Sequence, residues 1–167
     1  MNSNTCLVDN GTRELSETGA MRESNEGRGR CDLLTLHEVG TIISDSESDE
    51  SHILNCIDNY IRLGYVNDLY AAIEIFIKDN YPDRYTALLE LSKHYEQGAL
   101  KYADRNWEKG IKLHSFINSG VRHYLKFKRG DQDEPHDRAF LWNMFGAIWT
   151  HNNKPEMIDL PFKEIEK

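Results

Sequence analysis

The sequence predicts an all-α fold, a helical bundle of four to five helices with a flexible polar N-terminal arm. Between residues 51 and 152, apolar residues recur at steps of three and four, which places them on one face of a helix. Turn residues interrupt this pattern at Gly64, Pro82, Gly130 and Pro155. No segment alternates apolar and polar residues between hairpin turns, so no β-sheet is expected. Helices packed on helices are the architecture that this pattern favours.

Residues 1–30 form the expected arm because they are polar and rich in Asn, Ser, Glu, Gly and Arg. Residues 19–34 read GAMRESNEGRGRCDLL, which is open to two interpretations. One is a solvated linker. The other is a Gly-Arg segment that folds over an anion, with Arg30 as a substrate contact, because glycine lets backbone N–H groups approach a phosphate closely. Residues 31–167 are expected to form a single domain.

Two packing helices are expected after the acidic, serine-rich run at residues 44–51. The first ends at Gly64, and Asn67 is expected to cap the second, which ends near Pro82. Neither helix carries an obvious cluster of reactive residues, so residues 41–85 are interpreted as extra helices that serve packing.

The catalytic helices are expected within residues 86–152. The first begins at Asp83 or Thr86, and Gly98 in its middle indicates close approach of another backbone or of a ligand. The next spans about 113–127. The last begins near Glu134 and Pro135, because proline at the first helical position and acidic residues in the first turn are typical of a helix start.

Composition excludes several classes of protein. The net charge of −8 argues against binding of a nucleic-acid polymer, which needs a basic face. The three cysteines are far apart, so neither a zinc site nor a disulfide framework is expected. No apolar run reaches the length of about 18 residues that spans a membrane. The N-terminal residues lack the apolar core of a signal peptide, so the cytoplasm is the expected location.

Glu134 and Asp137 are the strongest candidates for a metal site. If both lie on one helix, their spacing of three residues places the two carboxylates on the same face. Like charges remain close most readily when a cation lies between them, and Asp133 is near enough in sequence to join. The alternative is a charged first turn that the helix dipole stabilises.

A second group of candidates follows along the chain. Glu96 is a candidate ligand because Lys101 and Tyr102 follow it, although a plain surface glutamate is the alternative. Lys101 offers a point charge for a phosphate, and Tyr102 offers an aromatic face and a hydroxyl. Asn106 carries paired groups that can read a base edge, and Trp107 is either a stacking platform or a core anchor.

The third group lies on the helix expected at 113–127. Arg122 and Lys126 are four residues apart and form a basic pair suited to phosphate, or one that balances the acidic helix opposite. His123 lies beside them, where a hydrogen-bonded structural histidine is the alternative to a ligand.

Three segments resemble the phage-associated dATP/dGTP diphosphohydrolase domain family, which is related to MazG-like all-α nucleoside triphosphate pyrophosphohydrolases. They read EGRGRCDLL, LSKHYEQGALKYADRNWEKGI and SGVRHYLKFKRGDQDEPHDRAFLWNM. The resemblance implies hydrolysis of a deoxynucleoside triphosphate to the monophosphate and pyrophosphate, Mg²⁺ or Mn²⁺ on helix carboxylates, and a homodimer or homotetramer. Glu134 and Asp137 match the second half of the MazG-like ExxE and ExxD motifs. Glu96 departs from the first half, because Lys93 and Ala99 stand where its acidic partner would be.

The expected function is therefore a metal-dependent pyrophosphohydrolase acting on a purine deoxynucleoside triphosphate, dGTP or dATP. Glu96 and Glu134 are the candidate catalytic residues, and Glu96, Asp133, Glu134 and Asp137 the candidate metal ligands. The alternative is a non-enzymatic helical module of phage origin that binds a nucleotide or a protein, and the incomplete ExxE motif supports it. The candidate substrate contacts are Arg30, Lys101, Tyr102, Asn106, Trp107, Arg122, His123 and Lys126.

Overall fold

A computed structural model of the chain describes residues 13–23, 31–34 and 50–162. The predictions made for Arg30 and for the acidic run before residue 50 lie outside these residues. The described α-helices are α2 (Glu50–Leu63), α3 (Val66–Asn80), α4 (Arg84–Tyr102), α5 (Leu113–Arg129) and α6 (His136–Asn153). Short 3-10 helices lie at η1 (Cys31–Leu33), η2 (Asn106–Lys109) and η3 (Pro155–Met157). The predicted all-α helical bundle is confirmed.

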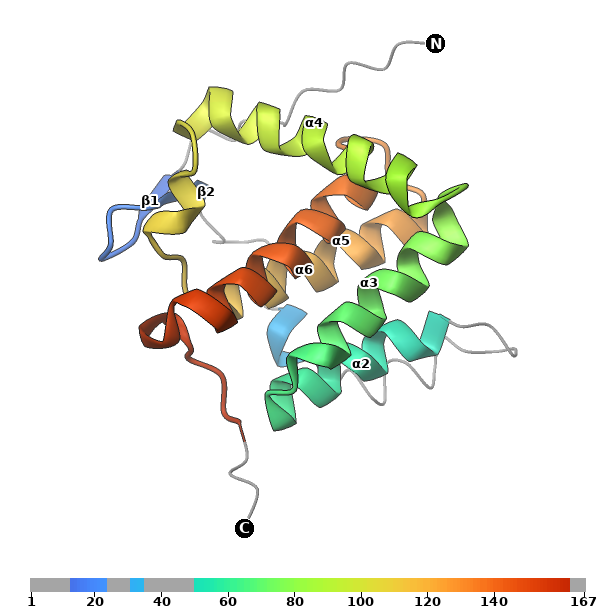
Figure 1. Cartoon of the computed structure of the whole chain (residues 1–167), viewed down its shortest axis with the longest axis horizontal. Coiled ribbons are helices and arrows are strands. Elements are labelled where there is room, and N and C mark those ends of the chain that lie inside the picture. Colours follow the sequence, from blue (N-terminus) through green and yellow to red (C-terminus); the bar gives the residue numbers. More distant parts are fainter. Residues whose placement is uncertain (1–12, 24–30, 35–49, 163–167) are drawn as a thin grey trace.

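Helices α5 and α6 pack against each other and form the centre of the bundle (Figure 1). Helix α4 crosses one side of this pair, and α2 and α3 cover another. Their shared core contains fully buried Phe116, Ile117, Phe140 and Met144. Because α5 and α6 pack closely at the centre of the bundle, they fix the positions of the polar side chains that they carry.

Two glycines allow α5 and α6 to approach closely. A Cβ atom at Gly120 would lie 2.2 Å from the end of Met144, and one at Gly146 would lie 2.4 Å from the Phe116 ring. The sequence placed the close approach at Gly98 instead, but a Cβ atom there would meet nothing within 4 Å. The close backbone approach predicted at Gly98 is therefore wrong; the alternative of an approach by a ligand stays a prediction.

Gly146→Ala is expected to destabilise the protein by about 1–3 kcal/mol, because the new methyl group overlaps a buried ring that has little room to move. Gly98→Ala on α4 is the matched control. It is expected to be neutral or to stabilise by up to about 1 kcal/mol, since alanine favours a helix and the space is open. Urea unfolding of both variants measures the difference. Equal stabilities would contradict the tight α5–α6 contact.

The helix ends follow the local signals in most places. Gly64 ends α2 with a positive φ of 74°, and Gly130 ends α5 with a φ of 85°, a conformation that favours glycine. Asp83 caps α4 by accepting hydrogen bonds from the backbone N–H groups of Tyr85 and Thr86, at 2.8 and 2.9 Å. Asn67 does not cap α3, which begins at Val66 after a very short turn.

The start of α6 differs from the prediction in a way that matters for the site. The helix begins at His136, and Pro135 is its N-cap rather than its first helical residue. Glu134 therefore precedes the helix, while Asp137 lies in its first turn. The prediction that these two carboxylates share one helix face is wrong, because one of them lies on a non-helical segment.

Part of the expected flexible arm has a defined structure. Strands β1 (Arg13–Leu15) and β2 (Met21–Glu23) form a small antiparallel hairpin that the sequence did not predict. The turn contacts the main chain of the bundle, since the Thr18 hydroxyl donates to the Gly110 carbonyl at 2.6 Å. The side chain of Asn106 donates to the Met21 carbonyl at 2.9 Å and accepts from its N–H at 3.3 Å. These long-range contacts hold the hairpin against η2.

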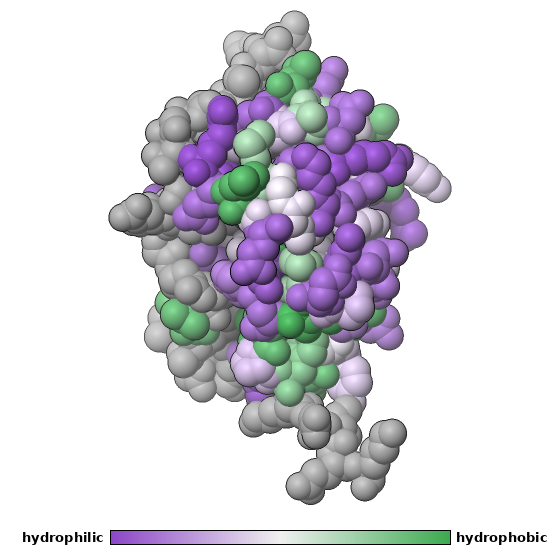
Figure 2. Space-filling view, turned by 90° about the vertical axis from the view of Figure 1, so that its left-hand side faces the viewer, coloured by the Kyte–Doolittle hydropathy of each residue, from purple (hydrophilic) through white to green (hydrophobic). Residues whose placement is uncertain are grey.

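The side of the molecule that carries β1, β2 and η2, on the left in Figure 1, is mostly hydrophilic where its residues are described, with smaller apolar areas (Figure 2). Within the part of the chain that the structure describes, no helix is long and apolar enough to cross a membrane.

Candidate functional site

A cavity of about 640 Å³ lies between α4, η2, α5, β2 and the segment before α6. Many residues that the sequence singled out line its wall. They are Glu96, Tyr102, Asn106, Trp107, Arg122, His123 and Glu134. The structure thus brings together groups that are up to 38 positions apart, from Glu96 to Glu134, around one space of the size that binds small molecules.

Four other predicted residues lie outside the lining of this cavity. Asp137 accepts a hydrogen bond from the Tyr81 hydroxyl at 2.6 Å. Lys126 donates to Asp133 at 2.8 Å. Lys101 lies over the Tyr102 ring, with Nζ 5.4 Å from its centroid.

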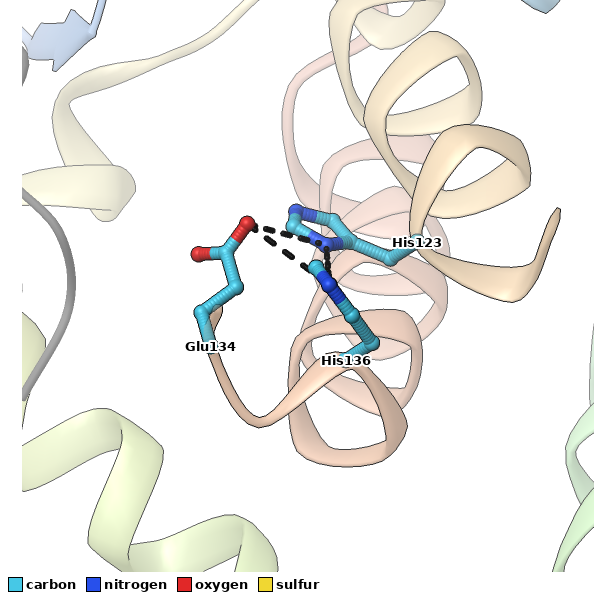
Figure 3. Close-up of side chains that lie close together, drawn as sticks. All are labelled: His123, Glu134 and His136. Carbon is cyan, nitrogen blue, oxygen red and sulfur yellow. Dashed lines mark hydrogen bonds and ion pairs between the residues drawn. The ribbon is translucent and has the colours of Figure 1, made fainter. Parts of the chain in front are cut away.

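His123, Glu134 and His136 form a compact group of polar side chains beside the cavity (Figure 3). The Nδ1 atoms of the two histidines are 3.0 Å apart, and each lies 3.6 Å from Glu134 Oε1. The side chain of His136 is only 1% exposed, that of His123 12% and that of Glu134 18%. The three groups come from α5, from the loop after it and from the first residue of α6.

Asp133 and Lys126 extend this group toward solvent. Asp133 Oδ1 lies 2.7 Å from His136 Nε2, and its other oxygen accepts from Lys126. The hydrogen bond from Lys126 is the main reason that the pKa of Asp133 lies well below its usual range, and the bond from His136 adds to it. Asp133 is therefore ionised at neutral pH and orients His136.

Burial keeps two imidazoles of the cavity wall, those of His123 and His94, neutral. It lowers the pKa of His123 well below its ordinary value, with Arg122 and His136 adding repulsion. Burial and the neighbouring Arg138 lower the pKa of His94, which also lines the cavity, to about 4. Neutral imidazoles are the form that ligates a metal.

Potential metal ligands gather differently from the predicted set. Among the described residues, two groups of three place their ligand atoms within 4.8 Å of one another. One is His123, Glu134 and His136, and the other is Asp131, Asp133 and His136. Neither group contains Glu96 or Asp137. His136 was missed because nothing in the local pattern shows that it meets His123 from the preceding helix.

Another part of the wall, next to His123, is cationic. Arg22 on β2 and Arg122 on α5 both donate to the hydroxyl of Ser119, Arg122 at 2.9 Å. Arg22 also donates to Asn143 Oδ1 at 3.2 Å, and its guanidinium lies 5.6 Å from the centroid of the Phe116 ring. Arg22 was part of the Gly-Arg segment in sequence, but its contact with a residue 97 positions away has no local signal.

The aromatic part of the wall combines both alternatives considered for Trp107. Its ring packs edge-on against Trp149, with centroids 4.8 Å apart, and also lines the cavity. Asn106 is buried, and its amide is engaged with the backbone of Met21. The structure therefore gives Asn106 a partner that differs from the predicted base.

The burial of His94 predicts a loss of stability in acid. Folded His94 stays neutral down to about pH 4, whereas the unfolded residue takes up a proton near 6.5. The unfolded state thus binds more protons between these values, and the contribution to stability falls by up to about 3 kcal/mol as the pH drops through this window.

His94→Gln should remove this part of the pH dependence, measured as the free energy of unfolding in urea between pH 7 and pH 4. His52→Gln changes an exposed histidine on α2 and is the matched control, with the slope of the native protein. An unchanged slope in His94→Gln would contradict the argument.

Comparison with known proteins gives one finding. Residues 84–160 match the family model described as dATP/dGTP diphosphohydrolase, N-terminal. The matched residues cover α4, α5, α6 and the loops between them, which supply most of the cavity wall. Among curated proteins and solved structures, none is significantly similar to this chain.

Proposed function

We propose that this protein is a metal-dependent nucleotide pyrophosphohydrolase, because residues 84–160 match the family model described as dATP/dGTP diphosphohydrolase, N-terminal. Its substrate is a purine deoxynucleoside triphosphate, dGTP or dATP, and its products are the monophosphate and pyrophosphate. One observation carries the proposal. A single cavity combines an arginine pair, a carboxylate beside the imidazole of His123, and aromatic rings, which are the groups that phosphates, a divalent ion and a base require.

The arginine pair is the proposed contact for the phosphates. Two guanidinium groups that share one hydroxyl lie close together, so their charges add at one point of the wall. A triphosphate carries several negative charges, and a bidentate guanidinium matches the spacing of phosphate oxygens. Lys101 and Lys126 stay predicted contacts at the periphery, where Lys126 also neutralises Asp133.

The carboxylates are the proposed site of the divalent ion and of the reaction. Glu134 lies beside the imidazoles of His123 and His136 at the edge of the cavity, a donor set that suits Mn²⁺ better than Mg²⁺. A bound ion would offset phosphate charge and lower the pKa of a water molecule. Water attacks the α-phosphorus, and the bond to the β-phosphate oxygen breaks as pyrophosphate leaves. Glu96, a carboxylate elsewhere in the wall, is the proposed acceptor of the water proton.

The purine is proposed to lie against Tyr102 and Trp107. Both rings line the cavity, and an aromatic ring stacks on a base with about 1–3 kcal/mol of stabilisation. Asn106 is now proposed to act indirectly, by holding β2 and thus Arg22 in place.

The direct test is a substrate screen. The purified chain is incubated with each deoxynucleoside triphosphate, with Mn²⁺, with Mg²⁺, and with a chelator, and pyrophosphate is quantified. The proposal expects release from dGTP or dATP with metal and none with chelator. Absence of release from all substrates under all metal conditions would contradict it. Inorganic phosphate in place of pyrophosphate would show that a different bond is cleaved.

A second candidate function is a non-enzymatic nucleotide-binding module. The absence of Glu96 and Asp137 from both groups of potential ligands in the described residues favours it. Titration calorimetry separates the two, because binding of dGTP without metal and without turnover would support the module. The molar mass measured by light scattering after size-exclusion chromatography checks the predicted homodimer or homotetramer.

A further inference from the structure

The three side chains in Figure 3 have the geometry of metal ligands, and they differ from the acidic set that the resemblance implied. One atom of each side chain lies close to those of the other two: His123 Nδ1, His136 Nδ1 and Glu134 Oε1. They come from the middle of α5, the first residue of α6 and the loop between, so two packed helices fix the separation of the two histidines.

The distances fit one ion. The three atoms form a triangle with sides of 3.0, 3.6 and 3.6 Å. Ligands at about 2.1 Å from an ion are about 3.0 Å apart at octahedral angles and about 3.4 Å apart at tetrahedral angles. The circle through this triangle has a radius of about 2.0 Å, so an ion at about 2.1 Å from every atom sits within about 1 Å of their plane.

The surrounding hydrogen bonds present the correct nitrogen of His136. Its Nε2 lies 2.7 Å from the carboxylate of Asp133, which therefore accepts the ring proton at that position. The lone pair on Nδ1 then faces His123 and Glu134. A carboxylate behind a ligating histidine is the usual outer partner in metal sites, and Lys126 holds this one in turn.

The site also has an open side. Its His123 and Glu134 line the cavity, whereas His136 is buried behind them. A buried histidine, His94, lines the same cavity, and its Nδ1 has no hydrogen-bond partner among the described residues. Three protein ligands on one side of an ion leave the remaining positions for water and substrate.

We propose that His123, Glu134 and His136 form a three-ligand site for a transition-metal ion such as Mn²⁺ or Co²⁺, with Asp133 as the residue that positions His136. Two imidazole ligands favour these ions over Mg²⁺, which prefers oxygen ligands. The site deepens the metal requirement of the proposed function, but its existence depends only on the side-chain geometry.

The test measures metal binding directly on the full chain without nucleotide. Calorimetric titration with Co²⁺, Mn²⁺ and Mg²⁺ should give one ion per chain, with Co²⁺ at least about tenfold tighter than Mg²⁺. The visible spectrum of the Co²⁺ form reports nitrogen ligation. Glu134→Gln and His123→Asn should each weaken Co²⁺ binding at least about 100-fold, and Asp133→Asn by about 10–100-fold.

His114→Asn is the matched control for His123→Asn, because His114 lies on the same helix and pairs with Asp159 at 2.5 Å, away from the cavity. It should bind Co²⁺ like the native chain. In the native chain, Mn²⁺ should also broaden the imidazole NMR signals of His123 and His136 first, a readout that needs no variant. Co²⁺ affinity that is unchanged in both Glu134→Gln and His123→Asn would overturn the proposal, as would broadening confined to other histidines.

Failure here is distinguishable from failure of the proposed function. If the chain binds Co²⁺ through these residues but releases no pyrophosphate, the metal site is supported and the proposed enzymatic function is contradicted. If the native chain releases pyrophosphate with Mg²⁺, and Glu134→Gln and His123→Asn both keep native Co²⁺ affinity, the enzymatic function is supported and this metal site is contradicted.

Discussion

Glu134→Gln is expected to lower the rate of pyrophosphate release by at least about 10³-fold, which corresponds to about 4 kcal/mol of lost transition-state stabilisation. Glutamine keeps the size of the side chain but removes the negative charge beside His123 and His136. Because the Glu134 side chain is 18% exposed and lies on a loop before α6, the free energy of unfolding should change by less than about 1 kcal/mol. Single-turnover kinetics with dGTP and Mn²⁺ measure the rate.

Glu156→Gln provides the control for this change. Glu156 is an exposed carboxylate in η3 that pairs with Lys154 at 3.9 Å, and it lies outside the cavity lining. It should retain the native rate. If Glu134→Gln turns over at the native rate while melting normally, Glu134 has no part in the reaction and the proposed site is wrong.

Arg22→Ala and Arg122→Ala are expected to lower kcat/KM for dGTP by about 10²–10³-fold each, because each removes a cation from the proposed phosphate contact. The double variant should lose less than the product of the two single losses, since both side chains donate to the same hydroxyl of Ser119. Lysine at either position should recover only part of the activity, because it keeps the charge but loses the planar fork.

Arg62→Ala is the control for the arginine variants. Arg62 lies on α2, where it pairs with Asp58 at 3.5 Å, and it does not line the cavity. Its kcat/KM should equal that of the native chain. Far-UV circular dichroism checks that Arg22→Ala has not simply lost its fold. Native kcat/KM in both Arg22→Ala and Arg122→Ala would show that phosphate binds elsewhere.

Sequence signals predicted the helices well where the cause is local. Asp83 caps α4 through hydrogen bonds within three residues, and Gly64 and Gly130 end their helices through their own backbone conformation. Asn67 and the start of α6 were predicted wrongly, because a capping residue type and a proline each suit more than one position at a helix start. The hairpin was missed since its strands are very short and its partners are Gly110 and Asn106.

The sequence predicted which residues belong to the candidate site, but it did not predict which of their side chains contact one another. Glu96, Arg122, His123 and Glu134 do line one cavity. The contacts that the predicted acidic residues make were not predictable from the sequence. Asp137 accepts a hydrogen bond from Tyr81, and Glu134 lies beside His123 and His136. Whether the acids and the arginines act as proposed stays a prediction for the experiments above.

The sequence by itself determined that the chain is helical and roughly where α2 to α6 lie, and it singled out Glu96, Arg122, His123 and Glu134, which line the cavity. These follow from periodicity and from residue type, which are properties of neighbours along the chain. The tertiary structure decided which groups meet: Arg22 with Arg122 at Ser119, and His123 with Glu134 and His136. These contacts depend on how two helices and a distant hairpin pack. Side chains that are far apart in sequence come into contact only when the folded core brings their helices and strands together.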